Sequence, residues 1–288
     1  KEKKDQAIDI GYEVMGGSAG TREGSGIDIG YRAMYNGKDG NSGTLVGNSA
    51  GQYLQGIEAT YIGREAGRFA TGSYNTFVGT NAGRGPSSTP YASGNYNTVM
   101  GYNAHDAFTT GKQNVAIGWE AATSLTTGYY STFLGVRAGR SVTTGNVNTF
   151  IGWQAGYAVT TTSNKTAIGY RAGYADGGAM DVHIGYEAGR NVTAGDNISI
   201  GRSAGQGFHG VGQTEFQANT TNRYNVSIGT FAGQKAIGTN SVNVGYQAGW
   251  YATGSNNTFL GSQAGKGGNS SAPYSSGQNN TAVGSEAL

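Results

Sequence analysis

Apolar and small residues recur along this chain in an eight-residue pattern that is present sixteen times. The pattern is a β-branched residue, a variable residue, an aliphatic residue, a key glycine, two variable residues, alanine and usually glycine, as in Thr149–Gly156. Counted from the key glycine, the β-branched and aliphatic residues occupy positions −3 and −1. These positions share a parity, so in a strand their side chains face the same side. We expect them to face the core, and the variable position −2 to face outward.

The spacing of the key glycines predicts the fold class. Twelve of the fifteen intervals are 16, 17 or 19 residues, shorter than the ~34 residues of a helix pair or the ~40 of a propeller blade. A second apolar position, at +7, is followed by threonine and usually by a turn glycine. It is occupied by Ala70, Phe108, Leu125, Val142, Val159, Val192 and Ala252. We therefore predict an all-β fold, a parallel β-solenoid of about 16 coils of 16–17 residues with two short strands per coil, in one elongated domain over residues 1–288.

A single coil is too small to be stable by itself. It buries about three aliphatic side chains, at ~1.5–3 kcal/mol each, whereas ordering its backbone costs ~1–2 kcal/mol per residue. The 53 glycines of the chain raise that cost. We expect coils to stack on one another and chains to associate, most simply as a homotrimer around a long axis.

Three segments interrupt the period, at residues 84–96, 206–224 and 266–279. The first and third are similar in sequence and begin 182 residues apart, which indicates a higher-order repeat of ten coils and favours a piece of a longer fibre. Loops that project from a rigid scaffold are common binding sites. In the second insertion, the candidate binding residues are Phe208, His209, Phe216 and Arg223. The alternative is a solvated loop.

Composition excludes several classes of partner. Charged residues make up only 12% of the chain and the net charge is +2, so we expect no binding of nucleic acid or anionic membranes. No apolar run approaches the ~20 residues of a membrane span, so we expect no membrane insertion. No signal peptide begins at residue 1, and with no cysteine there are no disulfides. The abundance of glycine, threonine, asparagine and tyrosine is typical of external fibrous proteins.

The ionisable residues form no catalytic or metal-binding motif. The histidines at 105, 183 and 209 lie in different coils without ligand spacing, and Asp176-Gly177-Gly178 is a single turn fragment. A glycosidase would need two carboxylates brought together in space. Position +2 carries Glu13, Glu65, Glu120, Glu187 and Glu286. We expect these to form an exposed polar stripe, and we predict neither enzymatic activity nor a cofactor or metal.

Asparagine and aromatic residues also follow the repeat. Asparagine stands at −4 in eight copies, where its side chains can hydrogen-bond from coil to coil. Aromatic residues occupy −2 (Tyr61, Phe77, Phe133, Phe150, Phe259) and +1 (Tyr12, Tyr31, Tyr102, Trp119, Trp153, Tyr170, Tyr186, Tyr246). We interpret both series as packing between chains; the alternative is a carbohydrate-stacking face. Ice binding is disfavoured because there is mostly one threonine per coil, without a regular double row.

The phrase Asn-Thr-x-Ile-Gly-x-x-Ala-Gly, as in Asn148–Gly156, resembles the head repeat of trimeric autotransporter adhesins and the repeat region of bacteriophage and bacterial tail fibres. The likeness covers residues 8–288, although adhesin heads use shorter coils. It implies a left-handed parallel β-roll and a trimeric extracellular fibre, on a virion or cell surface, that spaces or presents a receptor-binding element. A cell-surface glycan or receptor is the implied partner, and no catalytic residue carries over. A filament built by end-to-end stacking and a carbohydrate-active fibre remain as alternatives.

Overall fold

The computed structural model describes residues 8–14, 25–37, 42–207, 222–268 and 276–288. Within these ranges it contains sixteen three-residue strands and no helix. The strands are β1 (Ile8–Ile10), β2 (Ile27–Ile29), β3 (Thr44–Val46), β4 (Thr60–Ile62), β5 (Thr76–Val78), β6 (Thr98–Met100), β7 (Val115–Ile117), β8 (Thr132–Leu134), β9 (Thr149–Ile151), β10 (Thr166–Ile168), β11 (Val182–Ile184), β12 (Ile198–Ile200), β13 (Val226–Ile228), β14 (Val242–Val244), β15 (Thr258–Leu260) and β16 (Thr281–Val283). Each strand occupies positions −3 to −1 of one copy of the repeat.

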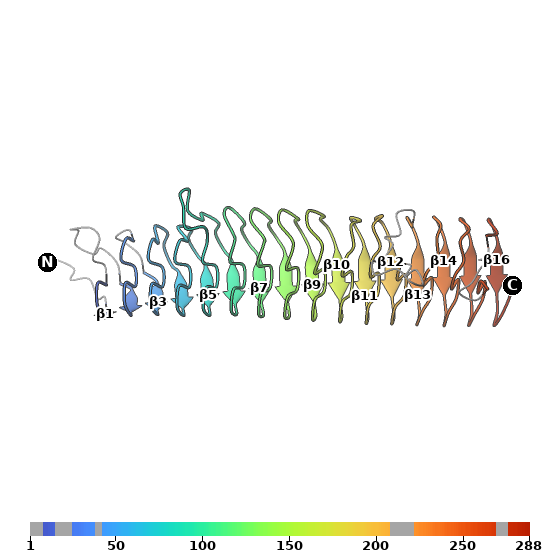
Figure 1. Cartoon of the computed structure of the whole chain (residues 1–288), viewed down its shortest axis with the longest axis horizontal. Helices are drawn as coiled ribbons and strands as arrows, with labels where there is room; N and C mark the ends of the chain where they lie inside the picture. The colour runs from blue at the N-terminus through green and yellow to red at the C-terminus, as the bar shows by residue number, and fades with distance from the viewer. Residues whose placement is uncertain (1–7, 15–24, 38–41, 208–221, 269–275) are drawn as a thin grey trace, which may run out of the picture. The chain divides into compact units, whose positions relative to one another are not determined.

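The contacts of the chain divide it into two compact units, residues 1–147 and 148–288. In the first, β1 to β8 each pair in parallel with the next strand, and in the second β9 to β16 do the same (Figure 1). The register places equivalent positions side by side, for example Phe77 beside Val99. The predicted all-β parallel solenoid is confirmed in each unit, while its handedness stays a prediction.

The far side of each coil is less regular than we expected. In the described residues it contains no second named strand, and the only isolated bridges there are Ala70 with Ala92 and Lys112 with Tyr129. Backbone hydrogen bonds still join the coils there, such as those from Thr109 N and Gly111 N to Thr126 O at 2.9 and 3.0 Å.

Our prediction of the core face is wrong. From β2 to β16 the middle residue of each strand, at −2, is buried, and the residues at −3 and −1 are half-buried or exposed. The interior is narrow, so the −2 side chain meets the opposite turn directly: a Cβ on Gly83 would lie 2.6 Å from the Phe77 ring. Stacking between coils lets position −2 vary, since Phe77 rests on Tyr61 at 4.8 Å between ring centroids. The aromatic residues at −2 are therefore interior and do not pack between chains.

The rest of the interior comes from the alanines at +3 and from the residues at +7. Ala50, Ala138 and Ala204 have no exposed surface, and the same holds for Phe108 and Val142. The predicted second apolar position therefore faces the core, although it is not in a regular strand.

The key glycine is required at the corner for two reasons. At Gly152 the backbone has a φ of +130°, and a Cβ would lie 2.5 Å from the carbonyl oxygen of Gly169. Only glycine adopts that φ without strain and leaves room for the next coil. The glycine at +4 has positive φ as well, for example +58° at Gly156, which confirms the predicted turn.

The asparagines at −4 form the predicted coil-to-coil hydrogen bonds. Asn97 N donates to Asn75 Oδ1 at 2.8 Å, and Asn114 N donates to Asn97 Oδ1 at 3.0 Å. Each side-chain amide also donates to a turn carbonyl, as Asn97 Nδ2 does to Gly111 O at 2.9 Å. These side chains are fully buried, so the row satisfies backbone groups that the interior would otherwise leave unpaired.

The insertion at 84–96 folds back onto its own unit. Tyr91 packs against Tyr53 and Phe69, with ring centroids at 4.9 and 5.7 Å, and Ala92 rejoins the coil by its bridge to Ala70. Of the other two insertions, residues 208–221 and 269–275 lie outside the described residues.

Candidate functional site

The predicted binding loop falls mostly outside the described residues. Phe208, His209 and Phe216 are among the residues that the structure does not describe. Arg223 is described, and its side chain is 55% exposed. Its Nη2 donates to Asp196 Oδ2 at 3.4 Å, and its guanidinium lies 5.3 Å from the centre of the Tyr224 ring. The hypothesis of a binding loop stays a prediction.

Four of the five glutamates at +2 pair with arginines, namely Glu13, Glu65, Glu120 and Glu187. Arg137 Nε and Arg140 Nε donate to Glu120 Oε2 at 2.9 and 3.0 Å, and Arg190 Nη1 donates to Glu187 Oε1 at 2.6 Å. At these four glutamates the stripe is half-buried under its arginines, whereas we expected an exposed one, and Glu286 is exposed as expected. None of these ion pairs brings two glutamates together as a glycosidase would need.

The outer strand face, defined in each unit as positions −3 and −1 of its strands, is an exposed surface with many apolar side chains. It carries Thr, Val, Ile, Leu or Met at each of these positions and no charged residue. At least 37% of the side chain is exposed in Ile8, Ile10, Ile27, Ile62, Met100, Leu134, Ile198, Ile228, Val242, Leu260 and Val283. Contiguous apolar surfaces of this kind mark sites of association.

An exposed aromatic ladder at +1 follows the same strands, one residue beyond the key glycine. Trp153, Tyr170 and Tyr186 stack from coil to coil with centroids 4.8 Å apart. The arginine at +2 covers some rings, as Arg137 covers Trp119 at 4.3 Å. Unlike the aromatic residues at −2, those at +1 are exposed, so a partner chain or a sugar ring could reach them.

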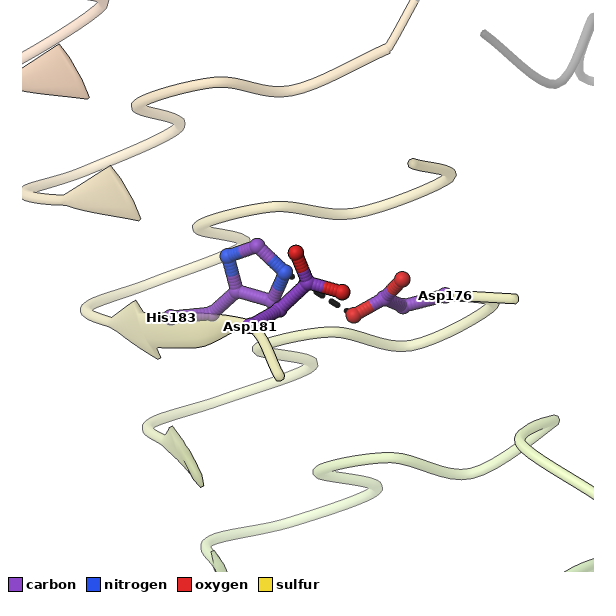
Figure 2. A group of neighbouring side chains, drawn as sticks. All are labelled: Asp176, Asp181 and His183. Carbon is purple, nitrogen blue, oxygen red and sulfur yellow. Dashed lines mark hydrogen bonds and ion pairs between the residues drawn. The ribbon is translucent and has the colours of Figure 1, made fainter. Parts of the chain in front are cut away.

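A buried ionic cluster formed by Lys165, Asp176, Asp181 and His183 lies inside the second unit. Lys165 Nζ lies 2.5 Å from Asp176 Oδ2 and 3.7 Å from Asp181 Oδ2, and it donates to the Asp176 backbone carbonyl at 2.7 Å. His183 Nε2 lies 2.9 Å from Asp176 Oδ2. Figure 2 shows Asp176, Asp181 and His183 pointing toward one another, with His183 on β11. All four side chains are at most 2% exposed.

The repeat explains how these side chains reach the interior. Lys165 and Asp181 stand at −4, the position of the asparagine row, and Asp176 stands at +7 between Val159 and Val192 of the neighbouring coils. Asp181 replaces asparagine as an acceptor, since its Oδ1 receives a hydrogen bond from Asn197 N at 2.8 Å. Its Oδ2 is buried and accepts no hydrogen bond, at the place where an asparagine would present a donor.

The two carboxyl groups have opposite pKa shifts. Burial, with the charge of Asp176, raises the pKa of Asp181 to about 7, so this acid holds a proton under mildly acidic conditions. Burial by itself also raises the pKa of Asp176. The neighbouring Lys165 ammonium and His183 outweigh that effect, so the pKa of Asp176 lies below its ordinary value. Asp176 is therefore the ionised partner of Lys165, and the carboxyl group of Asp181, with its raised pKa, lies beside the pair.

Two carboxyl groups and a histidine are the residue types of a divalent-metal site, but here the Lys165 ammonium occupies the place of a metal ion. One ligand atom each from Asp176, Asp181 and His183 lies within 4.8 Å of the others. The Lys165 ammonium already supplies positive charge to the same oxygen of Asp176, so the carboxylate is paired without a metal. Another buried histidine, His105, contributes no ligand set; burial lowers its pKa to about 3 and keeps it neutral.

We missed this cluster in the sequence because we placed position −2 outside and treated Asp176 as a turn residue. The available signal was the departure of four interior positions from the repeat within two consecutive coils. Lysine and aspartate replace the asparagine, aspartate replaces an apolar residue, and histidine occupies the middle of a strand. Such clustering of charge in an otherwise apolar and amide-lined interior identifies the place.

Comparisons with known proteins give this chain no family. No family model matches it, and no curated protein is similar to it at a significant level. Nowhere in the described ranges is there a helix long and apolar enough to cross a membrane.

Proposed function

We propose that this chain is a structural segment of an extracellular fibre or adhesin shaft, acting in host or surface attachment. It spaces or presents a receptor-binding element, and identical chains associate through their outer strand faces. The observation that carries the proposal is the exposed apolar face itself. A repeat that places β-branched and aliphatic residues on the outside in every coil, while its interior accepts Asp28, His183 or Ser199, selects for an external contact.

The energetics of the outer strand face favour association. Burying a whole Ile, Leu or Val side chain contributes ~1.5–3 kcal/mol. A side chain such as Ile62, 41% exposed, or Leu134, 42% exposed, still has roughly 1 kcal/mol to gain. Summed over the eleven half-exposed aliphatic side chains, the gain is on the order of 10 kcal/mol, comparable with the ~4–15 kcal/mol cost of association. The aromatic ladder would add the surplus that makes the assembly stable.

A second copy of the same chain is the occupant that fits best. Two or three identical solenoids have the same rise per coil, so their apolar rows stay in register along the contact. The face has no charge with which to attract nucleic acid or an anionic surface. We propose a homotrimer, in which the face of each chain is covered by two neighbours around one axis. A glycan on the aromatic ladder is the alternative occupant.

The test is the oligomeric state of the full chain and of one triple variant, Ile62→Asp, Met100→Asp and Leu134→Asp, by sedimentation velocity. The proposal expects a trimer for the parent chain and a folded monomer, by circular dichroism, for the variant. Val147→Asp is the matched control, because Val147 is 48% exposed but lies outside the strand face, and it should stay trimeric. A monomeric parent, or assemblies that the triple variant leaves unchanged as end-to-end stacking would, contradicts the proposal.

A further inference from the structure

We propose that Lys165 and Asp176 react with each other to form an intramolecular isopeptide bond, an amide between Nζ of the lysine and Cγ of the aspartate. Asp181 carries the proton that the reaction moves. The bond would be a covalent modification built by the folded chain itself. The inference is independent of the proposed function, since it depends only on the interior of the second unit.

The proximity of the two side chains favours the reaction. Lys165 Nζ and Asp176 Oδ2 are 2.5 Å apart, and the lysine is fixed further by its hydrogen bond to the Asp176 carbonyl. The nucleophile and the carboxyl group are therefore held in contact by the fold, which converts a bimolecular condensation into a unimolecular one. Such positioning is the main requirement for a reaction that each molecule performs once.

The exclusion of water from the interior favours the amide product. The side chains of Lys165 and Asp176 are 2% and 1% exposed, and valines stand in the +7 row of the coils on either side of Asp176. In water, hydrolysis opposes the formation of an amide from an amine and an acid. In the interior, bulk water does not reach the amide to hydrolyse it. The amide product also removes two buried charges whose desolvation is costly.

Asp181 also has one carboxylate oxygen that can move a proton, while its Oδ1 accepts the hydrogen bond from Asn197 N. Asp181 Oδ2 is fully buried, lies 3.7 Å from Lys165 Nζ and accepts no hydrogen bond. Asparagine occupies this position, −4, in eight other coils, and its side chain would supply the hydrogen bonds of the asparagine row. A carboxyl group here instead offers an oxygen that can take one proton and return another.

The reaction balances without any further reagent. A proton first passes from the Lys165 ammonium to the Asp176 carboxylate along their hydrogen bond, giving an amine and a carboxylic acid. The nitrogen lone pair attacks Cγ, a C–N bond forms, and the carbonyl electron pair moves to oxygen. Asp181 accepts a proton from the nitrogen and returns one to the hydroxyl group of Cγ. That group leaves as water, and the carbonyl re-forms.

His183 supports the same step from the other side. Its Nε2 lies 2.9 Å from Asp176 Oδ2, so in the tautomer protonated at Nε2 it donates to the oxygen on which charge develops. The ion pair of Lys165 with Asp176 is the resting state. Because the bond forms once and the product is protected from water, a small population of the neutral pair is sufficient over hours.

The experiment is intact-mass spectrometry and peptide mapping of the purified full chain. The isopeptide bond lowers the mass by one water molecule and blocks trypsin at Lys165. Digestion then releases a branched peptide that joins residues 141–171 to residues 172–190. A chain with the full sequence mass and a free Lys165 overturns the proposal.

Two variants separate this bond from the alternatives. Asp176 precedes Gly177, and aspartyl-glycine pairs can also lose water as a succinimide, which needs no lysine. Lys165→Arg should therefore restore the full mass, and retention of the water loss would assign it to the succinimide and refute the bond. Asp181→Asn restores the residue of the repeat and so should fold, but it should cross-link at least tenfold more slowly. An unchanged rate in that variant would remove Asp181 from the reaction.

Discussion

The orientation of the strands predicts a large difference between adjacent rows of side chains. Phe77→Ala removes a ring with no exposed surface that stacks on Tyr61 at 4.8 Å and meets Phe108 edge-on at 5.5 Å. Buried Phe→Ala substitutions cost about 3–5 kcal/mol, depending on how far the site collapses. Collapse is limited here because backbone hydrogen bonds fix the coils above and below. We therefore expect a loss of about 4–5 kcal/mol.

Ile62→Ala is the control on the other face of the neighbouring strand. Ile62 lies beside Val78 and is 41% exposed, so truncating it should cost about 1 kcal/mol or less in an isolated chain. The assay is urea denaturation followed by circular dichroism at two protein concentrations. If chains associate through this face, Ile62→Ala loses stability mainly at the higher concentration. A loss for Ile62→Ala equal to that for Phe77→Ala at both concentrations would refute the assignment of the core face.

Three further changes test the corner, the asparagine row and the buried cluster. Gly152→Ala should destabilise the chain by at least 3 kcal/mol, because the new Cβ lies 2.5 Å from Gly169 O at a φ of +130°. Gly177→Ala is the control and should be tolerated, because its Cβ meets nothing closer than 3.5 Å. Equal melting temperatures for the two variants would contradict the requirement for glycine at the corner. Asn97→Ala leaves Asn114 N and Gly111 O unpaired in the interior. The free energy of unfolding, measured by urea denaturation, should therefore fall by about 2–5 kcal/mol. A fall below about 0.5 kcal/mol would show that water replaces the side-chain amide. Asp181 binds its proton more tightly in the folded chain, where its pKa is about 7, than in the unfolded chain, so its contribution to stability falls as pH rises from about 4 to 7. Relative to the parent chain, Asp181→Asn should therefore gain about 2–4 kcal/mol between these pH values in matched denaturation series, and a constant difference would show that Asp181 does not titrate in this range.

The coil architecture follows from local requirements that can be read directly in the sequence. A glycine at the corner, alanine at +3 and glycine at +4 recur because each coil must turn tightly and lie against the next. The asparagine at −4 recurs because buried turn carbonyls and amides need a partner in every coil. These demands are met within one repeat and its neighbour, so the period alone predicted the parallel solenoid, the turns and the asparagine row.

The direction of the strand faces depended on the tertiary structure. Alternation divides a strand into two sets of side chains but does not say which set is enclosed. At −3 and −1, β-branched residues such as Thr76 and Val78 suggested a core, yet the coil closes around Phe77, because the narrow interior ends at the alanine-glycine turn. In this chain the residue types are restricted at the outward positions −3 and −1 and vary at the buried position −2. In most proteins the buried positions are the restricted ones. The physical reason is that stacking between coils adjusts to varied interior volumes.

The contacts within the ionic cluster, too, could be recognised only once the coils were closed. Lys165 and Asp176 are eleven residues apart on opposite sides of one coil, and no local rule relates their positions. The sequence by itself determined that the chain is a stack of similar coils with fixed corners. Only the tertiary structure decided what each coil encloses and what it presents to a partner, because enclosure depends on contacts across a coil and between coils, which periodicity does not encode.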